Sequence, residues 1–314
     1  MPRILCLIAA IALALSPGLC AQGEPVRVLF VGDVMLDNGP GHIITNGGDP
    51  FAPTAAVLRD AGLTIGNLEC AITRRGHHED KPYQFKGPLE ALPLVKKYCS
   101  AVSLANNHSG DWGKDGFAGQ LALLRESAVP YFGGGATVNE AWTPLVLEAR
   151  GKRVAFLGFN DFPPRRFEAR GLRPGCAWLI PGRVDAAIRE ARTRYHADYV
   201  LLFLHWGTEL EDHPEPGQQA LARRFIDAGA DAVIGGHPHV TQTIDWHRGK
   251  PIVYSLGNYL FDYFPGDPPL WTAWMARVTL GAPDGVGLEL FRIELDPAGV
   301  PHLKSSLPVH IQAR

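Results

Sequence analysis

The residues best suited to chemistry in this chain stand directly after short apolar runs. Residues 101–105 form such a run, and Asn106, Asn107 and His108 follow it at once, before Gly110 breaks the backbone. This order is typical of a buried strand in an α/β sheet, whose carboxyl end carries polar groups into a site. An amide oxygen beside an imidazole supplies one metal ligand and one proton donor. Taken alone, the stretch fits equally well a turn whose polar side chains bond loop backbone.

Four other apolar runs end in metal-ligating side chains in the same way. Residues 26–31 precede Asp33, residues 63–68 precede Glu69, residues 199–204 precede His205, and residues 231–234 precede His237 and His239. A lone carboxylate at such a position is more typical of a turn cap, and a lone histidine of a satisfied core side chain. Two imidazoles two residues apart, in a loop made tight by two glycines and a proline, favour metal binding.

Taken together, these strand ends predict a metal centre. Two carboxylates, one amide oxygen and three imidazoles form a mixed oxygen and nitrogen set that suits Mn, Fe, Zn or Mg, and the lack of thiolates argues against a purely structural zinc site. Six ligands are too many for one tetrahedral zinc and about right for two ions that share a bridging carboxylate. Two such ions would hold a hydroxide for in-line attack on a phosphoester. His108 would then be the general acid, and Asp111 would orient its ring.

The elements that must position these residues alternate between strands and helices. Helices are expected over residues 55–61, 89–98, 116–127, 184–195 and 218–228. Hairpins are expected from residues 145–149 with 154–159 and from residues 243–246 with 252–256. Antiparallel strands are expected in the tail, over residues 274–280, 286–295 and 302–311. This order predicts one α/β domain with mixed sheets, over residues 25–312.

Two loops carry further charge. Residues 81–86 read Lys-Pro-Tyr-Gln-Phe-Lys, and their lysines and rings could clamp an anionic substrate. A solvated loop with two packed rings is the more ordinary interpretation of that segment alone. Residues 161–175 are rich in Pro, Arg and Gly, and we expect them to flank the site. Their arginines, Arg165, Arg166 and Arg170, are either anion contacts or, more typically, a solvated face.

The amino terminus is unlike the rest of the chain. Arg3 precedes the apolar run 4–15, which is shorter than the roughly 20 residues of a membrane span but fits the core of a secretory signal. We expect residues 1–21 to be a signal cleaved near Cys20 or Ala21, or an uncleaved anchor that spans by tilting. A buried N-terminal helix is the remaining interpretation. The protein is therefore predicted to be exported, to the periplasm or the cell exterior.

Composition narrows the function further. The 314 residues include 46% hydrophobic and 20% charged residues, as in ordinary globular proteins. A net charge of −2 argues against non-specific nucleic-acid binding. Cys70, Cys99 and Cys176 remain after the predicted signal. An odd, low count is no disulfide scaffold, although Cys70 and Cys99 could pair in an oxidising compartment.

The motifs, in their order along the chain, resemble the CapA-type poly-γ-glutamate capsule-synthesis family, within the calcineurin-like metallophosphoesterase superfamily. The resemblance runs from about residue 28 to residue 262. The motifs that carry it are Gly-Asp at 32–33, Gly-Asn-Leu-Glu at 66–69, Asn-Asn-His-x-x-Asp-x-Gly at 106–113, His-Trp-Gly at 205–207, Gly-x-His-Pro-His at 235–239 and Ser-Leu-Gly-Asn at 255–258.

The resemblance implies a four-layer αββα sandwich and gives each ligand a role. Asp33 and His239 would bind a first metal ion, and Glu69 would bridge to a second. That second ion would be held by Asn107, His205 and His237, and the resemblance also makes His108 the acid.

One departure from the superfamily bears on the first metal. The superfamily's first motif is Asp-x-His, whereas Met35 stands in the histidine position here. The first site therefore loses a ligand, and is weak, absent or completed by Asp37. Glu69 also stands where the superfamily usually has Asp, which moves the bridge by about one methylene.

Two functions compete on these grounds. The first is a metal-dependent hydrolase that acts on a phosphoester or on an amide of a polyglutamate-like polymer. The second is a non-catalytic accessory protein that binds a growing anionic capsule polymer, with capsule-synthesis membrane proteins as partners. His108 beside the ligand set favours the hydrolase, because a pure binder needs no acid. Met35 favours the binder.

Overall fold

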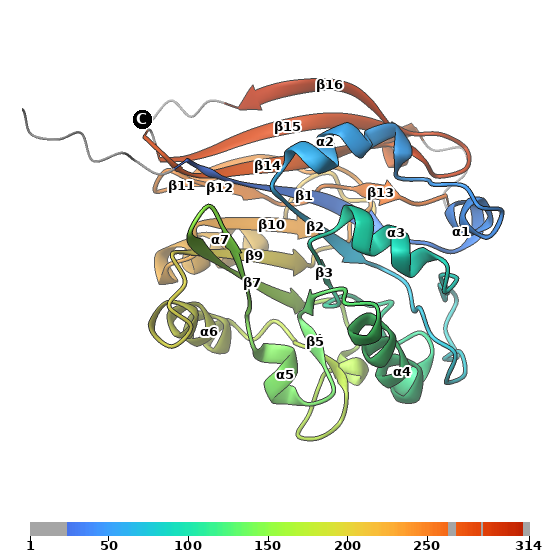
Figure 1. The fold of residues 1–314 in the computed structure, drawn as a ribbon. Helices are drawn as coiled ribbons and strands as arrows, with labels where there is room; N and C mark the ends of the chain where they lie inside the picture. Colours follow the sequence, from blue (N-terminus) through green and yellow to red (C-terminus); the bar gives the residue numbers. More distant parts are fainter. Residues whose placement is uncertain (1–23, 263–267, 284, 310–314) are drawn as a thin grey trace, which may run out of the picture.

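Two mixed β-sheets packed face to face form the inner layers of the protein (Figure 1). The structure is a computed structural model, which describes residues 24–262, 268–283 and 285–309. The first sheet has the order β16-β15-β14-β1-β2-β3-β4, and β13 also pairs with β1. Its strands are β1 (Val26–Val34), β2 (Leu63–Leu68), β3 (Ala101–Ser103), β4 (Tyr131–Phe132), β13 (Asn258–Leu260), β14 (Thr272–Ala282), β15 (Gly285–Leu295) and β16 (Pro301–Val309).

The second sheet has the order β11-β12-β10-β9-β7-β6. Its strands are β6 (Leu145–Ala149), β7 (Lys152–Asn160), β9 (Tyr199–His205), β10 (Ala232–Gly236), β11 (Ile244–His247) and β12 (Lys250–Val253). A small ribbon pairs β5 (Gly134–Gly135) with β8 (Gly175–Cys176). The central strands β7, β9, β10 and β12 are parallel, so their carboxyl ends meet at one edge.

Helices cover the outer face of each sheet. The first sheet packs against α1 (Asn38–Thr45), α2 (Ala55–Asp60), α3 (Ala91–Tyr98) and α4 (Gly113–Glu126). The second packs against α5 (Val138–Trp142), α6 (Pro181–Thr193) and α7 (Pro216–Ala228). Three short 3₁₀ helices complete the described elements, at Ala52–Thr54, Arg165–Phe167 and Pro268–Trp271. The order of layers is helix, sheet, sheet, helix, as the family resemblance implies.

Side chains alternate between the two faces of β1, so this one strand packs into two hydrophobic cores. Val28 and Phe30 face the second sheet, and the Phe30 ring meets the Phe203 ring edge-on at 5.6 Å between centroids. Leu29 and Val31 face the helices on the other side. A strand that is buried on both faces has a nearly continuous apolar sequence. For this reason residues 26–31 do not alternate between apolar and polar side chains, as a strand with one exposed face would.

Parallel register brings the polar strand ends together. Asp33 on β1 lies opposite Asn67 on β2, and Asn67 lies opposite Ser103 on β3. In the other sheet His205 lies between Asn160 and Gly236. The carboxyl ends of both sheets therefore open toward the same region, which is where ligands bind in open α/β sheets.

The predicted α/β fold with mixed sheets is confirmed, with differences in detail. The sequence carries no signal for α1, because Gly39, Pro40 and Gly41 are poor helix formers. Asp37 caps this helix by accepting the backbone N–H of Asn38 at 2.8 Å. The strand expected over residues 101–105 ends at Ser103.

Two further sequence expectations concern the amino terminus and the cysteines. The predicted signal or anchor, residues 1–21, lies outside the described residues and stays a prediction. No helix in the described part of the chain has the length and apolar character needed to cross a membrane. The predicted option of a Cys70–Cys99 disulfide is not realised, because both are buried free thiols whose pKa burial raises to about 12.

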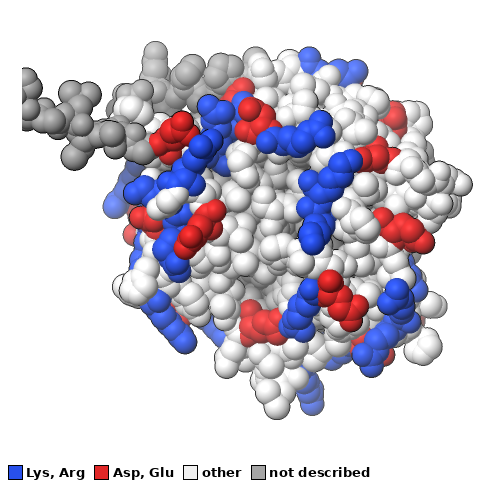
Figure 2. All heavy atoms as spheres, in the orientation of Figure 1, with Lys and Arg blue, Asp and Glu red and all other residues white. Residues whose placement is uncertain are grey.

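Charges of both signs are interspersed on the face seen in Figure 2. Ion pairs such as Arg153 with Glu148 and Lys97 with Asp49 lie at the surface and contribute little to stability individually. The face in view carries no large patch of one sign. This distribution agrees with the small net charge of the chain.

Close backbone packing behind the site predicts the effect of one glycine substitution. A Cβ on Gly235 would lie 2.0 Å from the carbonyl oxygen of Tyr254, so backbone must shift to admit it. We expect Gly235→Ala to lower the free energy of unfolding by about 3 kcal/mol or more, measured by urea denaturation. The matched control is Gly182→Ala in α6, where nothing lies within 4 Å of the new Cβ. Alanine there should raise stability by up to about 1 kcal/mol, and equal losses in both variants would contradict the packing argument.

Candidate metal centre

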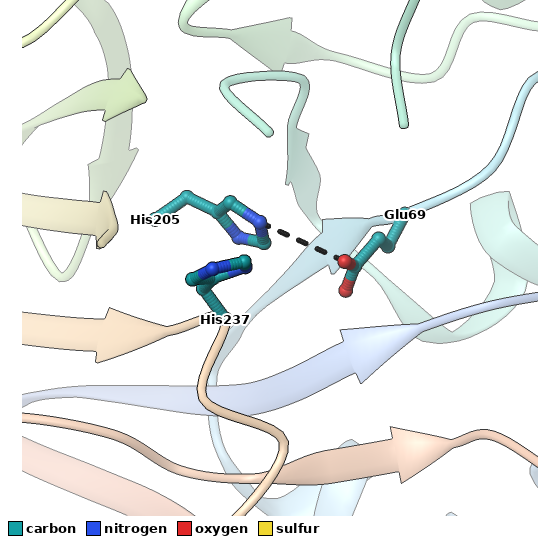
Figure 3. Close-up of side chains that lie close together, drawn as sticks. All are labelled: Glu69, His205 and His237. Atoms are coloured by element: carbon teal, nitrogen blue, oxygen red, sulfur yellow. Dashed lines mark ion pairs between the residues drawn. The ribbon is translucent and has the colours of Figure 1, made fainter. Parts of the chain in front are cut away.

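Ligand atoms from both sheets converge at the shared carboxyl edge. Glu69, His205 and His237 form one group, and Asp33, Glu69 and His239 form another, in each of which the ligand atoms lie within 4.8 Å of one another. Figure 3 shows the Glu69 carboxylate facing the rings of His205 and His237. Glu69 belongs to both groups, which is the place that a bridging carboxylate must take.

Two of these buried side chains have no partner for their polar atoms. Neither carboxylate oxygen of Glu69 and neither ring nitrogen of His237 has a hydrogen-bond partner among the described residues. Both residues are fully buried. Polar atoms in protein interiors are nearly always satisfied, so such a pair needs an explanation. A divalent cation among them would give a partner to the Glu69 carboxylate and to one ring nitrogen of His237.

Burial moves the pKa values of the cluster in opposite directions. It raises the pKa of Glu69 well above its usual range, and the nearby Asp33 carboxylate adds to the rise. It lowers the pKa of His205 and of His237 well below the usual range, and each is lowered further by neighbouring histidines. The His205 and His237 imidazoles are therefore neutral at physiological pH and can bind a metal ion. The Glu69 carboxylate lacks a neighbouring positive charge that would stabilise its ionised form.

His205 is held by two asparagines. Its Nε2 lies 2.7 Å from Asn107 Oδ1, and its Nδ1 lies 3.2 Å from Asn67 Nδ2. The same Nε2 lies 3.6 Å from a Glu69 oxygen. Asn107 Oδ1, one Glu69 oxygen and His205 Nε2 thus point at one place. The residues expected at the second metal, Asn107, His205 and His237 with Glu69, are brought together.

Asp33 and His239 are held in a similar way on the other side of Glu69. Asp33 accepts from Asn67 Nδ2 at 2.8 Å and from the backbone N–H of His237 at 3.3 Å. His239 donates from Nδ1 to Asn258 Oδ1 at 2.8 Å, with Asp33 3.5 Å away. Hydrogen bonds of this kind fix the ring orientation of metal-ligating histidines.

The loop that carries the two histidines is strained. His237 has φ +99° and His239 has φ +60°, the left-handed region that residues with a Cβ rarely adopt. Gly236 precedes them, and a Cβ there would lie 2.9 Å from a carboxylate oxygen of Asp33. Strained backbone persists only where the surroundings hold it, and it gathers at functional sites.

His108 and Asp111 form a second feature beside the ligands. His108 Nδ1 donates to Asp111 Oδ2 at 2.8 Å, and both side chains are buried. Burial lowers the pKa of His108, and Asp111 acts in the opposite direction. Lys81 pairs with Asp111 and donates to the backbone oxygen of Asn107 at 3.0 Å, while the ring of Phe85 lies 4.4 Å from that of His108.

The loop of residues 81–86 is therefore part of the site rather than a solvated loop. Lys81 and Phe85 contact the His108–Asp111 pair directly, as the preceding distances show. Of the arginines in the following loop, Arg165 and Arg170 pair with Glu168, and only Arg166 lines the neighbouring cavity. The expectation of a solvated arginine face fits the first two.

Asp37 does not complete the first metal site. Its carboxylate oxygens accept the backbone N–H groups of Asn38 and Lys86, and its own N–H donates to the sulfur of Met35 at 3.1 Å. Asp37 therefore caps α1 and fixes the 81–86 loop. That option of the sequence analysis is wrong, because the carboxylate is already engaged by two backbone donors.

A cavity of about 410 Å³ opens beside His108. Its lining combines rings with charged and polar side chains, including Lys81, Tyr83, Phe162, Trp178 and Glu209. Phe162 also packs on the ring of His237, with 4.2 Å between centroids. The cavity thus borders the cluster at Asn107, which lines it, and at Phe162.

Three residues of the site were not singled out from the sequence. Asn67 joins Asp33 to His205 across the two sheets, and Asn258 orients His239. Glu209 has a carboxylate within 4.8 Å of ligand atoms of His237 and His239. A polar residue inside an apolar strand was the signal available for Asn67. The motif Ser-Leu-Gly-Asn gave the signal for Asn258.

Residues 27–263 match the family described as bacterial capsule synthesis protein PGA_cap. The capsule biosynthesis protein CapA of Bacillus anthracis is 30% identical over 258 residues, which are 79% of this chain and 63% of that protein. The PGA biosynthesis protein CapA of Bacillus subtilis (strain 168) is 31% identical over 239 residues, 74% of this chain and 62% of that protein. The chain thus spans less than two thirds of the length of these relatives.

Among solved structures, the chain is similar to a 5'-nucleotidase precursor from Thermus thermophilus. The superposition covers 90% of this chain and 54% of that chain, with a TM-score of 0.48 and 14% sequence identity.

The unpartnered Glu69 carboxylate predicts the behaviour of a Gln variant. Because the folded state raises the pKa of Glu69, metal-free wild type loses stability as pH rises above the unfolded value of about 4.3. At pH 7.5 in chelator, Glu69→Gln should therefore melt at a higher temperature than wild type. Added Mn²⁺ should raise the melting temperature of wild type and leave that of Glu69→Gln nearly unchanged, by scanning calorimetry.

The control for this experiment is Glu126→Gln at the exposed end of α4, which should match wild type with and without Mn²⁺. The proposed metal centre would be contradicted if Glu69→Gln melted below wild type in chelator and Mn²⁺ raised its melting temperature as much as that of wild type.

Proposed function

Because the chain belongs to the bacterial capsule synthesis family PGA_cap, we propose that it is an exported, metal-dependent hydrolase that works in the synthesis or export of a capsule polymer. Its substrate would be a phosphoester, or an amide of a polyglutamate-like polymer. The observation that carries the proposal is the buried pair of unpartnered groups, Glu69 and His237, in a cluster whose Asn107 directly precedes His108 of the His108–Asp111 dyad.

The residues divide into two ligand sets that share Glu69. Asp33 and His239 would hold one divalent ion, and Asn107, His205 and His237 would hold the other. Ions bound there would polarise the oxygen of the scissile group and lower the pKa of a coordinated water. The donor set does not distinguish Mn, Fe, Zn or Mg.

We propose that His108, in its doubly protonated form, gives a proton to the leaving group. Its Nδ1 is committed to Asp111, so the ring is fixed in orientation and its Nε2 is the atom left to exchange a proton with substrate. Both side chains lie in a dry environment, which strengthens the hydrogen bond between them. Lys81 balances the charge of Asp111 and fixes the backbone that carries Asn107.

The cavity supports a substrate with both anionic and apolar parts. Lys114 lines it and lies 5.4 Å above the ring of Phe167, and Arg166 lines the same wall. Cations beside aromatic rings suit a carboxylate or phosphate carried on a longer chain. We propose capsule-synthesis membrane proteins as partners, in keeping with the capsule and PGA biosynthesis roles in the names of the Bacillus relatives.

One observation favours a second function. Met35 is buried, and its sulfur accepts a backbone N–H, so it offers the metal centre no replacement for a histidine at that position. A centre with a weak first site would suit an accessory protein that binds an anionic polymer without cleaving it. Turnover decides between the two.

Loss of the acid predicts a dependence on the leaving group. With Mn²⁺ present, His108→Ala should lower kcat about 10² to 10⁴-fold for an alkyl or phenyl phosphoester, whose leaving group needs a proton. The loss should be much smaller for a p-nitrophenyl ester, whose leaving group departs as the anion. Steady-state assays on a matched series of esters, together with a γ-glutamyl anilide, measure this difference.

The control is His77→Ala, which removes an exposed histidine from the nearby loop and should leave every rate unchanged. Equal loss for good and poor leaving groups would refute the role of His108. If the wild type bound metal but turned over none of these substrates, the hydrolase would be rejected in favour of the polymer-binding protein.

A further inference from the structure

We propose that Glu209 is a further ligand of the metal centre, which reaches it from the solvent side. The inference rests on the metal centre of the proposed function and adds a residue outside the strand ends. It concerns the group of Glu209, His237 and His239, whose ligand atoms lie within 4.8 Å of one another.

The first support is that the ring nitrogens of the buried His237 lack partners. Both of its ring nitrogens lack hydrogen-bond partners among the described residues, and the side chain is fully buried. His237 belongs to one ligand group with Glu69 and to another with Glu209. It is therefore shared by a group with a buried carboxylate and a group with an exposed one.

The second support is the backbone that places Glu209. The N–H of Leu210 donates to the oxygen of Pro238 at 2.9 Å, between the two histidines. Gln242 donates from Nε2 to the oxygen of Glu211 at 2.8 Å, which fixes the loop again two residues after Glu209. On the other side, Thr208 donates to Glu215 at 2.7 Å. The loop that bears Glu209 is thus fastened to the loop that bears the histidines.

Glu209 itself is held without a charge partner. Its carboxylate has no hydrogen bond or ion pair within the described part of the chain. Lys81 lines the same cavity but pairs with Asp111. A carboxylate kept beside two imidazoles, with no protein cation to balance it, is an oxygen donor suited to a divalent ion.

The placement of Glu209 differs from that of the other carboxylates in one respect. Asp33 and Glu69 are fully buried and come from the first sheet, whereas Glu209 is exposed, follows β9 of the second sheet and lines the cavity. Glu209 would therefore close the centre on the side from which substrate arrives.

The test is Mn²⁺ binding by the full chain after chelator treatment, for wild type, Glu209→Gln, Glu211→Gln and His237→Ala. Free Mn²⁺ is measured by its EPR signal during titration, and no turnover is needed. Glu209→Gln should weaken the affinity for one ion about 10 to 100-fold, the range found for residues that tune metal sites. Glu211→Gln alters an exposed carboxylate on the same loop and should titrate like wild type. Circular dichroism checks that each variant is folded.

Each outcome bears on the proposal. If Glu209→Gln binds Mn²⁺ like wild type while His237→Ala loses it, Glu209 is not a ligand, and the metal centre of the proposed function stands. If wild type binds no Mn²⁺, both are overturned. If Glu209→Gln weakens binding but the wild type hydrolyses nothing, Glu209 is a ligand and the hydrolase is rejected.

Discussion

A carboxylate buried between two sheets without a protein donor is the constraint on which the rest of this structure depends. Removing an isolated carboxylate from water costs many kcal/mol unless it is paired or bound to a metal. Glu69 faces neutral imidazoles instead, and its pKa is raised because burial and Asp33 both oppose its ionised form. A folded protein that keeps such a group must meet its charge in another way. A divalent cation does so, and it also satisfies His237.

The fold gathers these groups because both sheets present the carboxyl ends of parallel strands at one edge. Asn67 joins the sheets there, since its amide contacts Asp33 from its own sheet and His205 from the other. Gly236 lets the histidine loop approach Asp33 closely. The dyad of His108 and Asp111 comes from the loop after β3, and His108 lines the cavity together with Asn107. The proposed ligands, the proposed proton donor and the cavity are thus brought together by the same topology.

The sequence predicted the scaffold and most of the site because both rest on local signals. An apolar run followed by a polar residue marks a strand end wherever it occurs, so Asp33, Glu69, His205 and the two histidines of the following loop were visible. Helix α1 was not, because tertiary packing overrides the poor propensity of its glycines and proline. The predicted option that Asp37 completes the first metal site was wrong for the same reason, because Asp37 caps this unexpected helix. Glu209 reaches the site only because two loops fasten to each other, and no local pattern encodes that contact.

The most direct test of the dinuclear centre is anomalous diffraction from crystals of the Mn²⁺-loaded protein. A dinuclear centre should give two manganese peaks about 3.5–4 Å apart, with the Glu69 carboxylate between them. One peak should lie among Asp33 and His239, and the other among Asn107, His205 and His237. No peak at Glu69, or a single peak that leaves Glu69 and His237 without a ligand bond, would contradict it.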